Sequence, residues 1–220
     1  MKTTIKWTLW GIASLFYAYQ YILRVTPNIM IGDIMNQYQI DSSVFGQFSG
    51  VYYIGYSLAH LPLGLLLDRY GPKNVLPLFM GLTFLGTLPL VLTDFWIYPI
   101  IGRFFVGVGS SAAILGVFKI IRMTFPENQF TRMLSFSVMI GLIGALYGGR
   151  PVNDLKALYG FHEVTWGILI IGLVLIGLTY FMFPKYKSDS KEETAIEEIK
   201  TVMTAKKALL VCFLAGLMVG

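Results

Sequence analysis

Charged residues and cysteine are both scarce in this sequence, and each scarcity excludes a class of protein. Only 13% of the 220 residues are charged, 55% are hydrophobic, and the mean hydropathy is +0.66. A water-soluble domain does not have enough interior to bury that much apolar surface, so the composition indicates an integral membrane protein. The one cysteine, Cys212, excludes an intrachain disulfide and gives no information on the redox compartment.

Long apolar runs hold most of the hydrophobic residues. Crossing a hydrocarbon core of about 30 Å requires roughly 20 apolar residues in a helix, and the runs are too long for barrel strands. We therefore predict an all-α membrane protein, with a short connection at Thr93 and Asp94 that makes the third and fourth spans antiparallel neighbours. Six complete spans are expected, at about residues 7–28, 44–67, 75–93, 95–119, 131–152 and 165–183.

Three segments follow from this division. Residues 1–183 form a six-span unit, and residues 184–207 form a cytoplasmic linker that mixes both charge signs around apolar positions, as in an amphipathic surface helix. A seventh span begins near Ala208, but residues 208–220 are too few to cross a membrane. We expect the chain to be the front part of a longer protein, with a first span that is retained rather than cleaved as a signal peptide.

Positive charges are distributed unequally between the two sides of the predicted spans. With a cytoplasmic N-terminus, thirteen of the 17 Lys and Arg residues lie in cytoplasmic segments, and only Lys156 lies in an outer loop. This bias favours a cytoplasmic N-terminus, and we expect a multi-pass protein of the bacterial inner (plasma) membrane. Basic loops next to anionic lipid account for the high pI without a nucleic-acid partner. The thirteen are Lys2, Lys6, Arg69, Lys73, Lys119, Arg122, Arg132, Lys185, Lys187, Lys191, Lys200, Lys206 and Lys207.

Acidic residues are absent from the interiors of the six predicted spans, whereas arginines are present there. A charge inside hydrocarbon costs about 2.5–3.5 kcal/mol even on lenient scales, so such an arginine normally faces protein or water. Arg24 lies on a polar stripe of the first span, where its guanidinium could hold a carboxylate or phosphate by paired hydrogen bonds. The alternative is that Arg24 snorkels to the outer headgroups. The stripe consists of Ser14, Tyr17, Gln20, Tyr21, Arg24 and Asn28.

Arg103 and His60 are the other ionisable candidates inside the spans. Arg103 is too far from either membrane surface to snorkel, and it shares its helix face with Ser110 and Ser111. His60 can exchange protons near neutral pH, although a histidine that is only hydrogen-bonded within the bundle is the commoner case. The second-span face that carries it consists of Ser49, Tyr53, Tyr56, Ser57 and His60.

These patterns predict a substrate site on the first, second and fourth spans. Arg24, Arg103 and Arg150 all fall toward the outer side by residue count, which concentrates positive potential there and favours an anionic or zwitterionic solute. His60 is the candidate for proton exchange. The expected substrate-binding residues are Tyr17, Gln20, Tyr21, Arg24, Tyr53 and Arg103.

An enzyme is not expected, and neither is a cofactor or a metal. His162 and Glu163 are adjacent but are expected in a loop, no metal-ligand spacing is present, and no serine or cysteine has a nearby base. The many small residues of the fourth and fifth spans are explained by close helix packing. The six spans also divide three and three, as in an inverted repeat. Asp68, Tyr70 and Gly71 are faintly echoed by Asp154, Tyr159 and Gly160, although chance easily produces such an echo.

The loop between the second and third spans carries a specific motif, GLLLDRYGPK at residues 64–73. It resembles the signature loop of the major facilitator superfamily at the same position, although Pro72 stands where a second basic residue is common. The chain is therefore similar to the N-terminal half of such a transporter. In this family the loop is a conformational latch, whose aspartate meets the start of a helix in the other half. The matching residues are Gly64, Asp68, Arg69, Gly71 and Lys73.

Three further segments carry the resemblance. GRFFVGVGSSAA, residues 102–113, resembles the family's fourth-span motif, whose arginine is associated with proton coupling and is Arg103 here. GLIGALYGG, residues 141–149, is similar to the fifth-span motif of drug/proton antiporters, but Ala145 replaces its proline. YAYQYILRVTPN, residues 17–28, looks like first spans of bacterial members, including amino-acid importers of intracellular pathogens.

The resemblance implies a twelve-span protein whose two halves enclose a central site and rock about it. We expect a secondary active transporter of a small carboxylate-bearing solute, with an amino acid as the leading candidate and with proton coupling. Organophosphate exchange and drug/proton antiport are alternatives, and a non-transporting membrane receptor or assembly partner is an alternative of another class. The expected partners are the solute, protons, the lipid bilayer and the C-terminal half of the same transporter.

Overall fold

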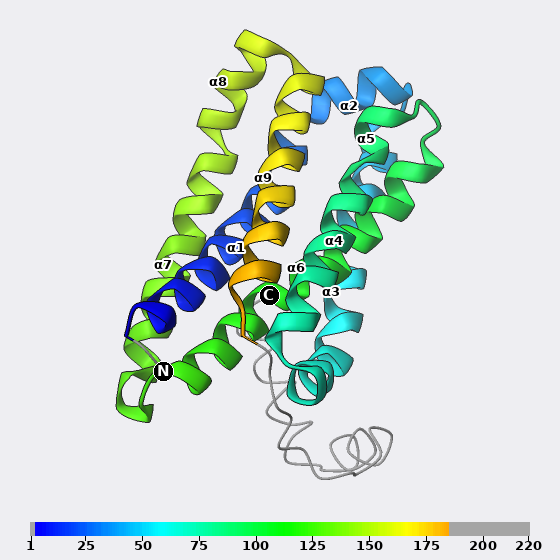
Figure 1. The fold of residues 1–220 in the computed structure, drawn as a ribbon. Helices are drawn as coiled ribbons and strands as arrows, with labels where there is room; N and C mark the ends of the chain where they lie inside the picture. The colour runs from blue at the N-terminus through cyan, green and yellow to red at the C-terminus, as the bar shows by residue number, and fades with distance from the viewer. Residues whose placement is uncertain (1–2, 185–220) are drawn as a thin grey trace. The chain divides into compact units, whose positions relative to one another are not determined.

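The computed structural model describes residues 3–184, and every regular element in that range is helical (Figure 1). The all-α fold is therefore confirmed. The predicted linker beyond Pro184, the seventh span and Cys212 lie outside the described residues. The elements are α1 (Thr3–Ile29), α2 (Ile31–Tyr38), α3 (Ser42–Tyr70), α4 (Pro72–Thr87), α5 (Pro89–Leu92), α6 (Ile97–Thr124), the 3₁₀ helix η1 (Glu127–Gln129), α7 (Phe130–Gly148), α8 (Arg150–Tyr159) and α9 (Phe161–Met182).

Each predicted span coincides with one long helix or with two consecutive helices. By length and apolarity, however, only four segments of residues 3–184 qualify as membrane spans, and α3 makes a fifth if its two bent parts count as one. α1 is 27 residues long, but its tyrosines, Gln20 and Arg24 lower its hydropathy. The polar stripe therefore removes the first of the six expected spans from this count. The four segments are Pro72–Leu92, Ile97–Thr124, Glu127–Tyr159 and Phe161–Met182.

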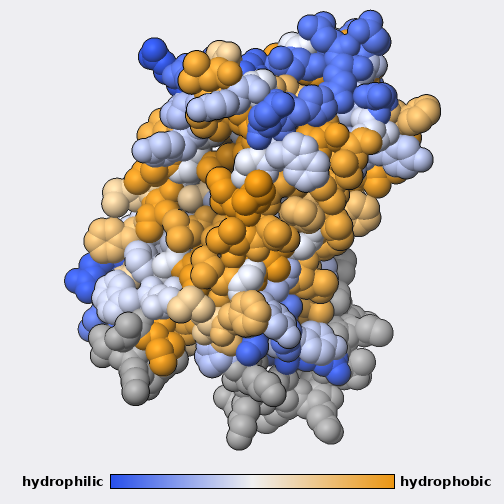
Figure 2. Space-filling model, turned by 45° about the horizontal axis from the view of Figure 1, so that its top comes forward, coloured by the Kyte–Doolittle hydropathy of each residue, from blue (hydrophilic) through white to orange (hydrophobic). Residues whose placement is uncertain are grey.

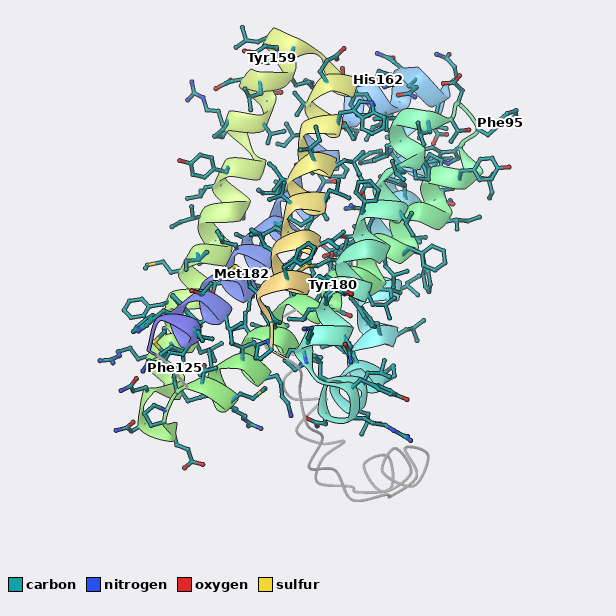
Figure 3. All side chains as sticks on the ribbon, viewed as in Figure 1. Phe95, Phe125, Tyr159, His162, Tyr180 and Met182 are labelled. Atoms are coloured by element: carbon teal, nitrogen blue, oxygen red, sulfur yellow. The ribbon has the colours of Figure 1, made fainter. Side chains whose placement is uncertain are left out.

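Apolar side chains cover the middle of the bundle. Figure 2 shows an orange band between ends that are richer in blue. Within the long helices, Leu85 and Leu173 are 61% and 55% exposed, as expected where lipid rather than water surrounds the protein. Figure 3 places Phe95 and Tyr159 at one end of the bundle and Phe125 at the other. The described residues thus form a multi-pass membrane bundle.

Proline and glycine set the bends and ends of the helices. Pro62 removes a backbone donor from α3, and the parts Ser42–His60 and Pro62–Tyr70 are bent by 50°. Gly71 ends α3 with a φ of 73°, a conformation in which a Cβ would be strained, and Pro72 occupies the first position of α4. The chain therefore reverses its direction at the predicted latch motif.

The helix α6 lies at the centre of the packing. It packs against α1, α3 and α4, while α1 also packs along α7, and α4 along α9 (Figure 1). The expected neighbours, the third and fourth spans, are thus in contact. In an inverted repeat the first three spans, α1, α3 and α4, correspond to the last three, α6, α7 and α9. The contact of α3 with α6 then corresponds to that of α7 with α1, and the contact of α4 with α6 to that of α9 with α1. The pairing has the pattern of an inverted repeat of three helices.

Glycines allow these helix pairs to approach closely. A Cβ added at Gly144 of α7 would collide with the backbone of Ala18 in α1, and a Cβ at Gly107 of α6 would collide with the backbone of Tyr52 in α3. Gly86 of α4 meets the backbone of α6 in the same way. Because lipid provides no hydrophobic drive between helices, this close packing is the main source of their association.

The short helix α2 holds one end of the bundle together. Lys156 Nζ of α8 donates to Asp33 Oδ2 of α2 over 2.7 Å. The Tyr38 hydroxyl lies 3.0–3.3 Å from the carbonyl oxygens of Pro89, Leu90 and Thr93. Burial, together with the negative charge of nearby Asp94, raises the pKa of Tyr38 to about 12, so it remains a neutral donor near neutral pH. The ends of α1, α5 and α8 are thus linked through α2.

Candidate functional site

Arg24 lies at the centre of a polar face formed by α1 and α3. Its Nε donates to the Tyr53 hydroxyl over 3.2 Å. The guanidinium carbon also lies 5.0 Å from the centre of the Tyr53 ring and 5.9 Å from the centre of the Tyr21 ring. Arg24 and Tyr21 are half-buried, and Tyr53 is 48% exposed. The structure therefore brings together three of the six expected substrate-binding residues.

Two further polar contacts join the same faces of α1 and α3. The Tyr52 hydroxyl donates to Gln20 Oε1 over 3.1 Å in a buried position, and the Ser49 hydroxyl donates to Asn28 Oδ1 over 3.4 Å. Tyr52 was not among the expected residues. Its spacing of three from Ser49 and four from Tyr56 could have identified it, since both lie on the predicted polar face.

The N-terminal half of the polar stripe packs against α7. The Tyr17 hydroxyl lies 3.3 Å from the Tyr21 hydroxyl, and the Tyr17 ring lies where a Cβ on Gly141 would stand. The Ser14 hydroxyl lies 2.8 Å from the Ser137 hydroxyl and is fully buried. Tyr17 thus adjoins the Arg24 cluster but is only 7% exposed, whereas Ser14 belongs to helix packing.

Arg103 is buried in the bundle and is directed at the backbone of α1. It is 5% exposed, and its Nη1 and Nη2 donate to the carbonyl oxygens of Leu23 and Arg24 over 2.8 and 3.3 Å. Its guanidinium carbon lies 4.7 Å from the centre of the Tyr52 ring and 5.4 Å from that of the Phe48 ring. Arg103 therefore supports the site from behind and is not exposed beside Arg24.

Pro27 explains why Arg103 is needed there. In an α-helix the Leu23 carbonyl accepts from the amide four residues later, but position 27 is proline and has no N–H. Arg103 supplies the missing donor from α6. Its Nε and the Thr26 hydroxyl have no hydrogen-bond partner within residues 3–184, and both residues border a cavity of about 30 Å³. That volume is close to the space of one water molecule.

His60 lies two residues before Pro62, at the bend of α3, and is half-buried. Its Nδ1 lies 3.0 Å from the Tyr56 carbonyl oxygen, and the two rings are 4.5 Å apart between centres. Tyr56 in turn stacks on Tyr52 at 5.9 Å. A row of rings thus connects His60 with the surroundings of Arg103.

Neither Arg24 nor Arg103 has an acidic partner in the described part of the chain. Between residues 3 and 184, the ion pairs join Lys119 to Asp68, Arg150 to Asp154 and Lys156 to Asp33. Arg150, which was expected to act with Arg24 and Arg103, is instead an exposed residue at the start of α8, 3.9 Å from Asp154. The positive charge of the site is therefore that of Arg24, backed by Arg103.

The latch motif lies at the end of the bundle opposite α2. Lys119 Nζ of α6 donates to Asp68 Oδ1 over 2.7 Å, and Arg69 lies over the Tyr70 ring at 5.7 Å. Gly64 and Asp68 border a hollow of about 170 Å³ together with Lys119. In this structure Asp68 is thus paired within its own bundle, although its side chain remains 66% exposed.

The expectation that His162 and Glu163 lie in a loop is wrong. Both residues belong to the first turn of α9, since Gly160, with a φ of 99°, ends α8 and lets the next helix begin at once (Figure 3). Residues 3–184 contain no cluster of three potential metal ligands from His, Cys, Asp and Glu.

Comparison with known proteins gives a consistent result. The family model described as Major Facilitator Superfamily matches residues 10–220. The chain is 26% identical over 203 residues to the "Putative metabolite transport protein NicT" of Pseudomonas putida, covering 87% of this chain and 45% of that protein. It is 23% identical over 200 residues to a "Quinolone resistance transporter" of Acinetobacter baumannii, covering 89% and 46%.

A third relative is the "Probable galactarate/D-glucarate transporter GudP" of Bacillus subtilis. It is 24% identical over 192 residues, which cover 84% of this chain and 42% of that protein. The chain thus spans about half the length of the curated relatives it matches. These relatives are named for different solutes, so similarity at this level does not identify one.

Proposed function

This chain belongs to the major facilitator superfamily, and we propose that it contributes the first half of a secondary active transporter for a small carboxylate-bearing solute. It is a transporter chain and not an enzyme. In the proposal an anionic or zwitterionic solute, with an amino acid as the leading candidate, binds on the α1–α3 face. The two halves of the complete protein then expose this face alternately to the two sides of the membrane.

The proposal rests on the hydrogen-bond donors and the charge of Arg24 that no described residue satisfies. Within residues 3–184 its hydrogen bond to Tyr53 uses only Nε, so its two terminal amino groups are available. A planar guanidinium with two such groups matches a carboxylate in a bidentate arrangement. The absence of an acidic partner in the described residues leaves its charge for an anion. Tyr21 and Tyr53 would contact the solute, while Tyr17 and Gln20, which are 7% and 2% exposed, lie buried behind them.

Arg103 has a supporting role in the proposal. Its contacts to the Leu23 and Arg24 carbonyls hold the backbone from which the Arg24 side chain extends. We assign proton coupling to His60 and Arg103. The rings of Tyr52 and Tyr56 lie between these two residues and pack against both. The latch residues Gly64, Asp68, Arg69, Gly71 and Lys73 would meet the other half on the cytoplasmic side, after Asp68 exchanges Lys119 for a helix start there.

Replacing Arg24 tests the proposal. In proteoliposomes that contain the protein expressed from its complete gene, Arg24→Ala is expected to reduce carboxylate uptake at least about tenfold, because the substitution removes the accessible cation that residues 3–184 place on this face. Arg150→Ala is the matched control, since this arginine is exposed at the start of α8 and is not among the residues that contact Arg24. Equal uptake by wild type and Arg24→Ala would contradict the proposal.

The same vesicles distinguish the other functions. Uptake driven by an imposed inside-alkaline pH gradient supports proton-coupled import. Efflux of quinolones, a solute class in the name of one relative, would favour drug/proton antiport, and exchange of sugar phosphates would favour organophosphate exchange. Binding of a solute without flux would indicate the receptor or assembly function.

A further inference from the structure

Tyrosine rings gather around Arg24 on the α1–α3 face. Tyr17 and Tyr21 meet edge to face with centroids 5.2 Å apart, and Tyr52 and Tyr53 do the same at 5.3 Å. A carboxylate needs only the guanidinium, so a carboxylate site by itself does not explain this concentration of phenol rings.

The two rings nearest to Arg24 are accessible, whereas those behind them form a packed wall. Tyr53 is 48% exposed and Tyr21 is half-buried, but Tyr52 is 1% exposed and Tyr17 is 7% exposed. A charge within a membrane span keeps lipid tails away from the face that carries it. The open ring faces of Tyr21 and Tyr53 therefore meet water, a solute or the remainder of the complete protein, and not lipid.

We propose that the solute is an aromatic carboxylate, whose carboxylate binds Arg24 and whose ring packs against Tyr21 and Tyr53. This inference rests on the proposed function and adds the chemical class of the solute. The guanidinium carbon lies 5.0 and 5.9 Å from the two ring centres, so a single small molecule can reach both kinds of group. The solute's ring must then be attached to its carboxylate directly or through a short chain, as in benzoate.

The chemistry of the face distinguishes aromatic from aliphatic solutes. Phenol rings favour another aromatic ring through stacked or edge-to-face contacts, beyond the apolar area that either kind of solute would bury. Tyr17 and Tyr21 already adopt the edge-to-face geometry, and Tyr52 and Tyr56 the stacked one. An aromatic solute would extend this arrangement, while a saturated ring of the same size would gain only burial.

Benzoate and cyclohexanecarboxylate provide a matched pair of probes. They share the carboxylate and the number of carbon atoms, and only benzoate has a π system. Thermal-shift titrations of the purified protein, expressed from its complete gene, give both dissociation constants. We expect benzoate to bind about fivefold to tenfold more tightly, from the usual strength of an aromatic pair, and benzyl alcohol, which has no carboxylate, not to bind.

Variants of the two open tyrosines locate the ring. Tyr21→Leu and Tyr53→Leu are expected to bring the ratio of the two constants close to one, while Tyr21→Phe and Tyr53→Phe should retain it because the ring remains. Tyr98→Leu is the control, since Tyr98 is exposed at the start of α6 and pairs with Phe95. A misfolded Leu variant would bind neither acid, whereas a folded one that has lost only the ring contact should still bind both acids through Arg24.

The outcomes separate this inference from the proposed function. If both acids bind equally well and Arg24→Ala abolishes binding of both, the carboxylate site stands and the aromatic inference is wrong. If the preference for benzoate persists in both Leu variants, the ring binds elsewhere and the inference is also wrong. If carboxylate uptake is unaffected by Arg24→Ala, the proposed function itself fails.

Discussion

At the scale of single residues, two arginines inside the membrane illustrate how packing separates similar side chains. Arg24 and Arg103 both lie within long helices and have no acidic partner in residues 3–184. Within these residues Arg24 uses only its Nε, beside the exposed Tyr53 and the half-buried Tyr21, so its terminal amino groups are available for an anion. Arg103 donates from Nη1 and Nη2 to backbone carbonyls of α1. One of them is the Leu23 carbonyl, which lacks its helical partner because residue 27 is proline. One is thus a candidate ligand and the other a support.

The support role of Arg103 predicts a coupling with Pro27. Arg103→Met is expected to destabilise the protein by about 1.5–3 kcal/mol, the usual value for a hydrogen bond made by a charged group. In a Pro27→Ala background the amide of residue 27 can donate to the Leu23 carbonyl again, so the same substitution should cost less. Thermal unfolding of the four proteins in detergent measures both costs. Equal costs in the two backgrounds would show that Arg103 does not replace the missing amide.

At the scale of elements, α1 combines two functions on different faces. Toward α3 it presents the polar residues Gln20, Arg24 and Asn28, and toward α7 it presents a backbone that glycines approach closely. The short contact with α7 fixes the position of α1, and hence the position of Arg24. The polar face and the packing face therefore depend on each other.

Gly144 tests this dependence. A Cβ at Gly144 would collide with the backbone of Ala18. Because a backbone cannot rotate away as the end of a flexible side chain can, Gly144→Ala is expected to destabilise the protein by about 1–3 kcal/mol. Gly81→Ala in α4 is the control, because a Cβ at Gly81 meets nothing within 4 Å and alanine favours a helix. In detergent, Gly144→Ala should unfold at a lower temperature than wild type and Gly81→Ala at a higher one. A neutral Gly144→Ala would show that α1 and α7 can separate without cost.

At the scale of the whole molecule, an apolar band surrounds a bundle whose α1–α3 face carries the charge. Exposure alone does not tell lipid from water, since Leu85 and Tyr53 are both strongly exposed in the described residues. The distinction comes from chemistry, because hydrocarbon accepts a leucine and rejects a guanidinium. The α1–α3 face must therefore face water or the remainder of the complete protein.

Cysteine labelling with a membrane-impermeant thiol reagent tests this orientation. On a Cys212→Ser background, Arg24→Cys and Asn28→Cys are expected to react in at least one conformational state, because water reaches the α1–α3 face. Leu85→Cys should stay unlabelled despite the 61% exposure of Leu85, since a thiolate does not form in lipid, and the fully buried Ala112→Cys should stay unlabelled as well. Lack of labelling at Arg24→Cys and Asn28→Cys in every state would contradict a hydrated site.

Local sequence patterns were sufficient for the helices and for part of the site. Arg24, Tyr21 and Tyr53 were expected together and are in contact, because helical spacing places each on a known face. Tyr52, which binds Gln20, was not predicted as part of the site. Arg103 was expected beside the substrate, whereas in the structure it is buried against the backbone of α1. The turn before His162 was misjudged because Gly160 can end one helix and start the next without a loop.

The apolar runs by themselves determined that the described chain is a bundle of long helices, because a backbone in lipid must satisfy its hydrogen bonds within the helix. The arginine-containing stripe likewise determined that one face of α1 avoids lipid. Only the tertiary structure decided what each charge does. Arg103 and Leu23 are 80 residues apart, and their contact arises from the way α6 packs against α1, which no local pattern records.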